Sequence, residues 1–246
     1  MSGIRITVTR VAGSVPRGVG TQMMVWPDRI EGTIGGGALE WAAMARAREM
    51  LAAERAALVE TFPLGPGLGQ CCGGSVTLDF ARADALDKPK GAPLWIYGAG
   101  HVGRALVGVM APLPDWEITW VDTGADRFPE APKVTVLPAT DPAMVVPHAP
   151  RDAHHLIVTY SHTLDLALCH AVLQHGFASA GLIGSATKWA RFRGRLAALG
   201  HAPEDIARIA CPIGDPALGK HPQAIAIGVA AAMLGHRTTQ RREEAG

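Results

Sequence analysis

The sequence has little of what marks several common classes of protein. Charged residues make up 18% of its 246 residues and the formal net charge is +1, so attraction to nucleic acid or to an anionic membrane is not expected. No apolar run reaches the roughly 18 residues of a membrane span. The start, Met1 to Arg5, does not read as a signal sequence. We therefore expect a cytoplasmic protein with no nucleic-acid or membrane partner.

Cysteine is also scarce. The chain has four cysteines, which are the adjacent pair Cys71 and Cys72 and the isolated Cys169 and Cys211. They form no C-x-x-C motif, and no histidine pair stands at zinc spacing. This pattern excludes a disulfide framework and a structural zinc site. Cys169 lies within a predicted helix and is expected in the core.

A chain of 246 residues is long enough for two domains that each bury a core. A polar stretch broken by proline and glycine predicts a linker at 83–92, between an N-terminal domain at 1–82 and a C-terminal domain at 93–246. Strands around one helix make the first domain α+β, whereas strands that alternate with helices give the second a parallel sheet. The predicted fold class is α/β, with a small N-terminal α+β domain followed by a Rossmann-type parallel-sheet domain.

A glycine motif organises the second domain. An apolar run from Leu94 ends at Gly98, and Gly98, Gly100 and Gly103 fit G-x-G-x-x-G before a helix-like segment. A second apolar run ends at Asp122, 19 residues beyond Gly103, where a Rossmann unit places the acid that accepts ribose hydroxyls. The pattern predicts a Rossmann-type unit and leaves open whether a dinucleotide binds.

Two further glycine-rich loops lie in the first domain. Gly13 to Gly20 reads either as a simple turn between strands or as a surface on which Arg17 binds an anion. Gly35, Gly36 and Gly37 precede a predicted helix, and three glycines in a row imply positive φ or close approach of another group. That group is either a ligand phosphate or the neighbouring strand.

The adjacent cysteines lie in a loop. Cys71 and Cys72 stand between Gln70 and Gly73 with no apolar period around them, which favours chemistry over packing. Backbone amides in a glycine-lined loop lower the pKa of a thiol, and the thiolate attacks sulfur or binds a soft metal. Molybdenum or a persulfide fits this loop better than zinc.

Polar side chains also follow a strand of the second domain. His162 and Asp165 come after the strand predicted at His155 to Tyr160, so they lie at the carboxyl edge of the sheet, where ligands bind in open α/β folds. The alternative is that Thr163 caps the next helix and His162 is merely solvated.

A later helix begins with four cations. Lys188, Arg191, Arg193 and Arg195 crowd the first half of this helix, where positive charge opposes the helix dipole. Either an anion or acidic partner faces them, or they form a solvated face.

Several motifs together resemble one known family. Gly13 to Arg17, Gly32 to Glu40, Cys71 to Gly74 and Gly98 to Gly103 occur in the order and form typical of the XdhC/CoxI family, the xanthine dehydrogenase accessory proteins. The resemblance covers nearly the whole chain. It extends to His162 with Asp165, to Gly184 and Ser185 with Lys188, and to Pro212 to Gly214.

The resemblance implies a carrier and maturation factor without turnover of its own. Members of the family are chaperones that bind molybdenum cofactor, support its sulfuration by a cysteine desulfurase and deliver it to xanthine dehydrogenase. The implied partners are the molybdenum subunit of that enzyme, the desulfurase, proteins of cofactor biosynthesis and a second copy of the chain.

The resemblance also implies site residues. Cys71 and Cys72 would touch the molybdenum or carry sulfur, with Cys71 as a molybdenum ligand. The expected cofactor-binding residues are Arg17, Gly35, Gly36, Gly37, Gly98, Gly100, His101, Gly103, Asp122, His162, Ser185 and Lys188.

An NAD(P)-dependent oxidoreductase is the alternative function. Gly98 to Gly103 and Asp122 would suffice as its cofactor site, but no catalytic Lys, Tyr or His can be placed. Hydride transfer has no need of adjacent loop cysteines, which favours the carrier. The segment Thr123 to Arg127 is longer than the usual turn of the family, which weighs against a ribose role for Asp122.

Overall fold

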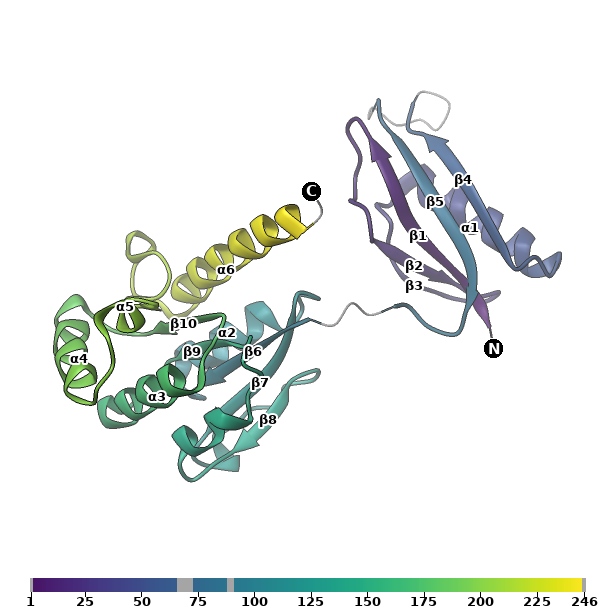
Figure 1. The fold of residues 1–246 in the computed structure, drawn as a ribbon. Coiled ribbons are helices and arrows are strands. Elements are labelled where there is room, and N and C mark those ends of the chain that lie inside the picture. The colour runs from purple at the N-terminus through teal and green to yellow at the C-terminus, as the bar shows by residue number, and fades with distance from the viewer. Residues whose placement is uncertain (1, 66–72, 88–90, 245–246) are drawn as a thin grey trace. The chain divides into compact units, whose positions relative to one another are not determined.

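A computed structural model of the chain describes residues 2–65, 73–87 and 91–244, with residues 236–244 as backbone only. The chain divides into two compact units, Met1–Lys88 and Pro89–Gly246 (Figure 1). Residues 84–87 of the expected linker belong to the first unit. There Arg5 forms an ion pair with Asp87, and Gln22 Nε2 donates to Asp87 Oδ2 at 3.4 Å.

The first unit is one helix on a five-stranded antiparallel sheet, with strand order β3-β2-β1-β5-β4 (Figure 1). Its elements are β1 (Gly3–Ala12), β2 (Gln22–Val25), β3 (Ile30–Gly32), α1 (Gly37–Ala52), β4 (Ala57–Pro63) and β5 (Ser75–Ala83). β3 was not predicted, because its three residues are all exposed and carry no period.

Alternation along β1 explains this arrangement. Ile4, Ile6 and Val8 are fully buried on the face that α1 covers, whereas Arg5 and Thr7 between them are half-buried on the other face. α1 contributes apolar residues such as Leu39 and Ala43 to the same core.

The second unit is a six-stranded parallel sheet with helices on both faces (Figure 1). Its strands are β6 (Ala92–Tyr97), β7 (Trp116–Asp122), β8 (Thr135–Pro138), β9 (His154–Ile157), β10 (Ser179–Leu182) and β11 (Ile209–Ala210). Its helices are α2 (His101–Met110), α3 (His162–His175), α4 (Ala186–Ala198), α5 (Pro203–Ile206) and α6 (Pro222–Glu244), with 3-10 turns η2 (Ala125–Arg127), η3 (Pro142–His148) and η4 (Pro216–Leu218).

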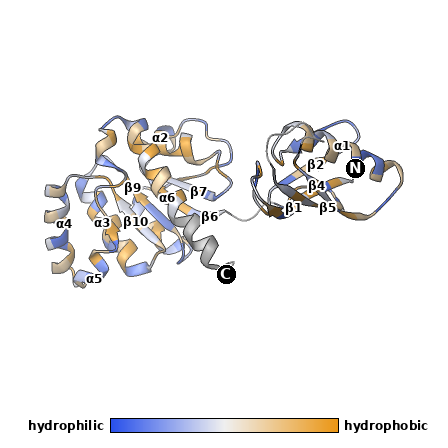
Figure 2. Ribbon diagram, turned by 90° about the horizontal axis from the view of Figure 1, so that it is seen from above, coloured by the Kyte–Doolittle hydropathy of each residue, from blue (hydrophilic) through white to orange (hydrophobic). Residues whose placement is uncertain are grey.

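The order β8-β7-β6-β9-β10-β11 is the Rossmann order, with the direction of winding reversed between β6 and β9. Together the two units confirm the predicted fold class. Separate cores lie on the two faces of this sheet, one under α2 and α6 and one under α3, α4 and η3. Hydrophobic colour follows α2 in Figure 2, whereas α4 is largely hydrophilic. Cys169 is fully buried in α3, as expected.

A buried histidine, His155, lies beside Tyr97 of the core under α3, α4 and η3. His155 of β9 is fully buried, its ring stacks on Tyr97 at 5.9 Å between centroids, and its Nδ1 lies 3.1 Å from Tyr97 Oη. Its Nε2 has no partner among the described residues. Burial, together with the charges of His175 and His154, lowers the pKa of His155 to about 3.

His155 should make stability depend on pH. In the unfolded chain it takes up a proton near pH 6.5, but in the folded chain only near pH 3, so folding excludes a proton between these values. The free energy of unfolding should therefore fall as pH drops below 6.5, by up to about 1.4 kcal/mol per pH unit from this group. Urea unfolding of His155→Phe checks this, since the slope between about pH 4 and 6.5 should be shallower than in the wild type. Equal slopes would contradict it.

Candidate functional site

The G-x-G-x-x-G glycines lie in the loop between β6 and α2 and in the first turn of α2, and packing requires two of them. Gly98 has a φ of +117°, and a Cβ there would lie 2.6 Å from the carbonyl oxygen of Val158. A Cβ on Gly103 would lie 1.8 Å from the carbonyl oxygen of Gly98. Gly100 differs, because a Cβ there would meet no atom within 4 Å. Space is therefore open at the start of α2, where no described side chain caps the helix and His101 is exposed.

Asp122 ends β7 next to this loop and is 4% exposed. Its carboxylate accepts hydrogen bonds from the amides of Ala99 and Thr123, and Arg127 Nε lies 2.7 Å from its Oδ1. Burial raises the pKa of Asp122, but these hydrogen bonds and the Arg127 charge outweigh it and hold the pKa below its usual value. The carboxylate therefore fastens the glycine loop to the end of β7.

A buried ion pair joins α3 to α4 beyond the ends of β9 and β10. Lys188 Nζ lies 2.6 Å from Asp165 Oδ2 and donates to the carbonyl oxygen of Ile183 at 2.8 Å. Thr159 Oγ1 donates to the other carboxylate oxygen at 2.7 Å. Asp165 is fully buried, and the side chain of Lys188 is 12% exposed. The anion that faces Lys188 therefore lies within its own domain.

His162 is the first residue of α3 and is exposed. Its ring approaches Phe192 of α4 edge-on, with the centroids 6.4 Å apart. The helix is capped by Ser161, whose Oγ accepts from Leu164, and not by Thr163. His162 therefore lies at the carboxyl edge of the sheet, one residue after the cap.

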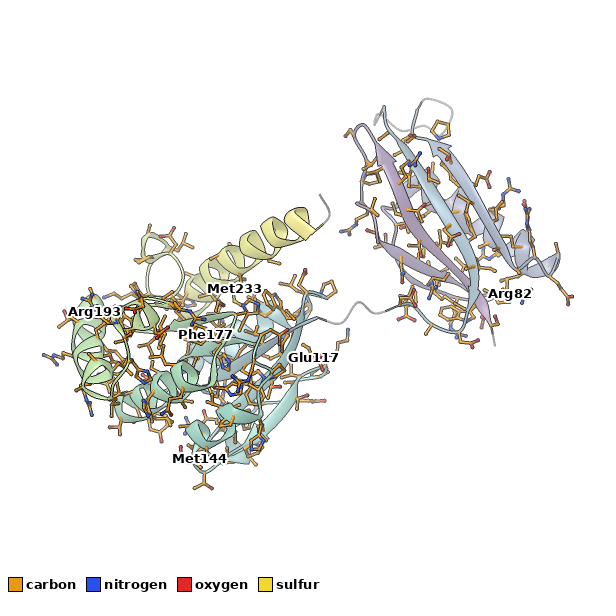
Figure 3. The ribbon with its side chains drawn as sticks, in the orientation of Figure 1. Arg82, Glu117, Met144, Phe177, Arg193 and Met233 are labelled. Carbon is orange, nitrogen blue, oxygen red and sulfur yellow. The ribbon has the colours of Figure 1, made fainter. Side chains whose placement is uncertain are left out.

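The start of α4 also has a local explanation. Ser185 caps the helix and accepts a hydrogen bond from the amide of Lys188 at 3.2 Å. Arg191, Arg193 and Arg195 are exposed, and Figure 3 labels Arg193 on this helix. Three of the four cations thus remain on a solvated face.

The second unit contains two free thiols, those of Cys169 and Cys211. Burial raises the pKa of Cys169 to about 12, so it is a core thiol. Cys211 is half-buried, and partial burial raises its pKa as well. Its Sγ would lie 3.3 Å from a Cβ on Gly184, beside the Lys188 side chain. Cys71 and Cys72 lie in 66–72, outside the described residues.

The glycine triplet of the first unit binds an anion that belongs to the chain itself. Gly35 to Gly37 have φ values of 133°, 78° and 64°. One carboxylate oxygen of Glu40 accepts from the amides of Ile34, Gly35 and Gly36 at 2.9, 3.2 and 2.8 Å, and from the hydroxyl of Thr33. Partial burial raises the pKa of Glu40, but these hydrogen bonds outweigh it and lower the pKa. This partner was not predicted from the sequence, although Glu40 stands in the same motif.

The motifs of the first unit converge. A Cβ on Gly35 would lie 2.5 Å from Pro16 Cγ, so the triplet packs on the loop that carries the exposed Arg17. A Cβ on Gly74 would lie 2.4 Å from the carbonyl oxygen of Ser14 in the same loop. Gly13 to Gly20 therefore touches both the glycine triplet and the described end of the cysteine loop.

Each unit has a cavity. One of about 360 Å³ is lined by Arg29, Glu40, Trp41 and Arg48 among others, and the Trp41 ring is exposed. Another of about 350 Å³ lies between α2 and residues 129–133. Both are in the size range of small-molecule sites. Within the described part of the chain, no cluster of three or more potential metal ligands occurs.

The fold and these loops define a Rossmann-type α/β protein with a second, smaller sheet domain. Residues 94–233 match the XdhC Rossmann domain, and residues 2–62 match the XdhC and CoxI family. The chain belongs to this family. A Rossmann fold allows nucleotide binding at the glycine loop. In the ranges that the structure describes, no helix is long and apolar enough to cross a membrane.

Two similar proteins extend the comparison. The uncharacterized protein YqeB of Escherichia coli K12 is 29% identical over 231 residues, which are 90% of this chain and 41% of YqeB. A crystal structure of a xanthine dehydrogenase from Bacillus halodurans has a TM-score of 0.78 and 18% identity, covering 95% of this chain and 91% of that one. At this identity the likeness concerns the fold. The chain spans less than half the length of YqeB.

Proposed function

We propose that the chain is a maturation factor for xanthine dehydrogenase, which binds molybdenum cofactor, supports its sulfuration by a cysteine desulfurase and delivers it to the molybdenum subunit. The observation that carries this proposal is the presence of both domains of the XdhC and CoxI family in one chain, with the adjacent pair Cys71 and Cys72 between them. The exposed arginines of α4 offer a cationic rim, and such rims mainly set the rate of association with a partner.

Two of the glycine loops precede a helix, and one of these leaves room for the phosphate of such a cofactor. The start of α2 has open space at Gly100, and helix starts favour anions. The amides at Gly35 and Gly36 already hold the Glu40 carboxylate, so a ligand phosphate would have to displace it. We therefore assign the phosphate to Gly98 to Gly103.

A soft ligand for molybdenum is the second requirement. Of the cysteines in the described ranges, Cys169 is fully buried, and the raised pKa of the half-buried Cys211 disfavours its thiolate. The proposal therefore assigns contact with molybdenum, or transfer of sulfur, to Cys71 and Cys72. When bound, the group supplies the molybdenum centre that its client enzyme requires.

Replacing these two cysteines tests the proposal. Cys71→Ala, Cys72→Ala and the double variant should each retain at least about tenfold less cofactor than the wild type, because the loop loses its thiolates. The measurement is the amount of molybdenum and of pterin bound per chain after incubation with cofactor and gel filtration. Cys211→Ala is the matched control and should bind like the wild type. Undiminished binding by all three loop variants would sink the thiolate assignment.

A further inference from the structure

Two residues meet across the glycine loop of the second unit. Arg127 follows β7 and Tyr160 follows β9, and the guanidinium carbon of Arg127 lies 4.9 Å from the centre of the Tyr160 ring. β6 lies between these two strands in the sheet. Since neighbouring strands are about 4.8 Å apart, the contact bridges positions about 10 Å apart. It therefore crosses the carboxyl end of β6, where the loop Gly98 to Gly103 begins.

Arg127 is held in this position from several directions. Its Nε lies 2.7 Å from Asp122 Oδ1. Its carbonyl oxygen accepts from Arg104 Nη2 at 2.8 Å, and Arg104 Nε donates to the carbonyl oxygen of Ala99 at 2.9 Å. The segment after β7 is thus tied to the same glycine loop that its side chain crosses. The Arg127 side chain is 35% exposed, so part of it still faces solvent.

Asp122 adds an independent observation. In a Rossmann fold the acid at this position accepts the ribose hydroxyls of a dinucleotide. A carboxylate has about four acceptor positions. Oδ1 of Asp122 accepts from the amide and hydroxyl of Thr123 and lies 2.7 Å from Arg127 Nε, whereas Oδ2 accepts from the amide of Ala99. Oδ1 is therefore fully occupied, and a ribose hydroxyl could reach only the second position of Oδ2, on a carboxylate that is 4% exposed.

We propose that Arg127 and Tyr160 are specificity-determining residues of the Rossmann crevice and that they exclude NAD and NADP. A dinucleotide lies across such a crevice, with its halves on opposite sides of the point where the strand order reverses. The Arg127–Tyr160 contact spans the end of β6 at this point, so it blocks the path that joins the two halves. Ligands that stay on one side of β6, such as phosphate monoesters, are admitted. The inference goes beyond the proposed function, because it excludes binding of the cofactor that an NAD(P)-dependent oxidoreductase would need.

Calorimetric titration with NAD and with NADP tests this inference. Wild type and Tyr160→Phe, which keeps the ring, should bind neither with a Kd below about 1 mM. Tyr160→Ala opens the crevice, and Arg127→Ala also frees Asp122, so the double variant should bind at least about tenfold tighter than the wild type. Tyr160 is 71% exposed, so the alanine variant should fold normally.

Three results would overturn the inference. One is wild-type binding of either dinucleotide with a Kd below about 1 mM. Another is a double variant that melts like the wild type and binds no better. The third is a gain in Tyr160→Phe equal to that in Tyr160→Ala, which would leave the ring without a role. None of these results bears on retention of molybdenum cofactor, which the cysteine variants report separately.

Discussion

Gly103→Ala is expected to lower the free energy of unfolding of the second unit by more than about 3 kcal/mol, or to prevent its folding. The added Cβ would lie 1.8 Å from the carbonyl oxygen of Gly98, and Gly103 is buried in α2. The carbonyl oxygen belongs to the backbone and the backbone fixes the position of the Cβ, so no rotation of a side chain can relieve the contact. To relieve the clash, α2 would have to move off β6. Urea unfolding followed by circular dichroism measures the effect.

Gly108→Ala is the matched control on the same helix. A Cβ at Gly108 would meet no atom within 4 Å, and alanine is the better helix former. This variant should be more stable than the wild type by about 0.5 to 1 kcal/mol. If Gly103→Ala were as stable as Gly108→Ala, the close packing of α2 on the end of β6 would be wrong.

Lys188→Met is expected to cost about 3 to 5 kcal/mol of stability, because it leaves the carboxylate of Asp165 buried without its cation. Asp165 is fully buried, and its contact with Lys188 Nζ at 2.6 Å joins the first turns of α3 and α4. Arg191→Met, at an exposed position of α4, should change stability by less than about 0.5 kcal/mol.

A double variant separates the loss of the pair from the burial of a lone charge. Asp165→Leu combined with Lys188→Met should recover most of the lost stability, because no uncompensated charge remains. Thr159, which donates to Asp165, keeps a second acceptor in the carbonyl oxygen of Ser161 at 3.2 Å. A Lys188→Met variant as stable as Arg191→Met would show that the pair adds nothing to stability.

Local sequence patterns predict most of the fold. The alternation of apolar residues and the glycines that end strands can both be recognised within short stretches of sequence. The run into Gly98 and the alternation along β1 both reappear as strands. A strand of two or three residues is too short to show a repeated alternation, so it leaves no such signal. β3 has three residues and β11 has two, and neither was predicted.

Partners distant in sequence limit what can be predicted of the site. Asp165 and Lys188 are 23 residues apart, and they meet only because β9 and β10 are neighbours and end at the same edge. The contact between Arg127 and Tyr160 depends in the same way on the order β7-β6-β9. The glycine triplet was expected to face either a ligand phosphate or the neighbouring strand, but its amides bind the carboxylate of Glu40, which the sequence pattern did not predict.

Transfer of cofactor tests the central claim most directly. The chain, loaded with molybdenum cofactor and freed of excess by gel filtration, is mixed with apo xanthine dehydrogenase, and the appearance of enzyme activity is followed over time. The proposal predicts that activity rises with the amount of loaded chain, while unloaded chain and the Cys71→Ala, Cys72→Ala double variant treated in the same way give none. A chain that retains no cofactor, or a loaded chain that activates the enzyme no better than the unloaded one, would contradict it.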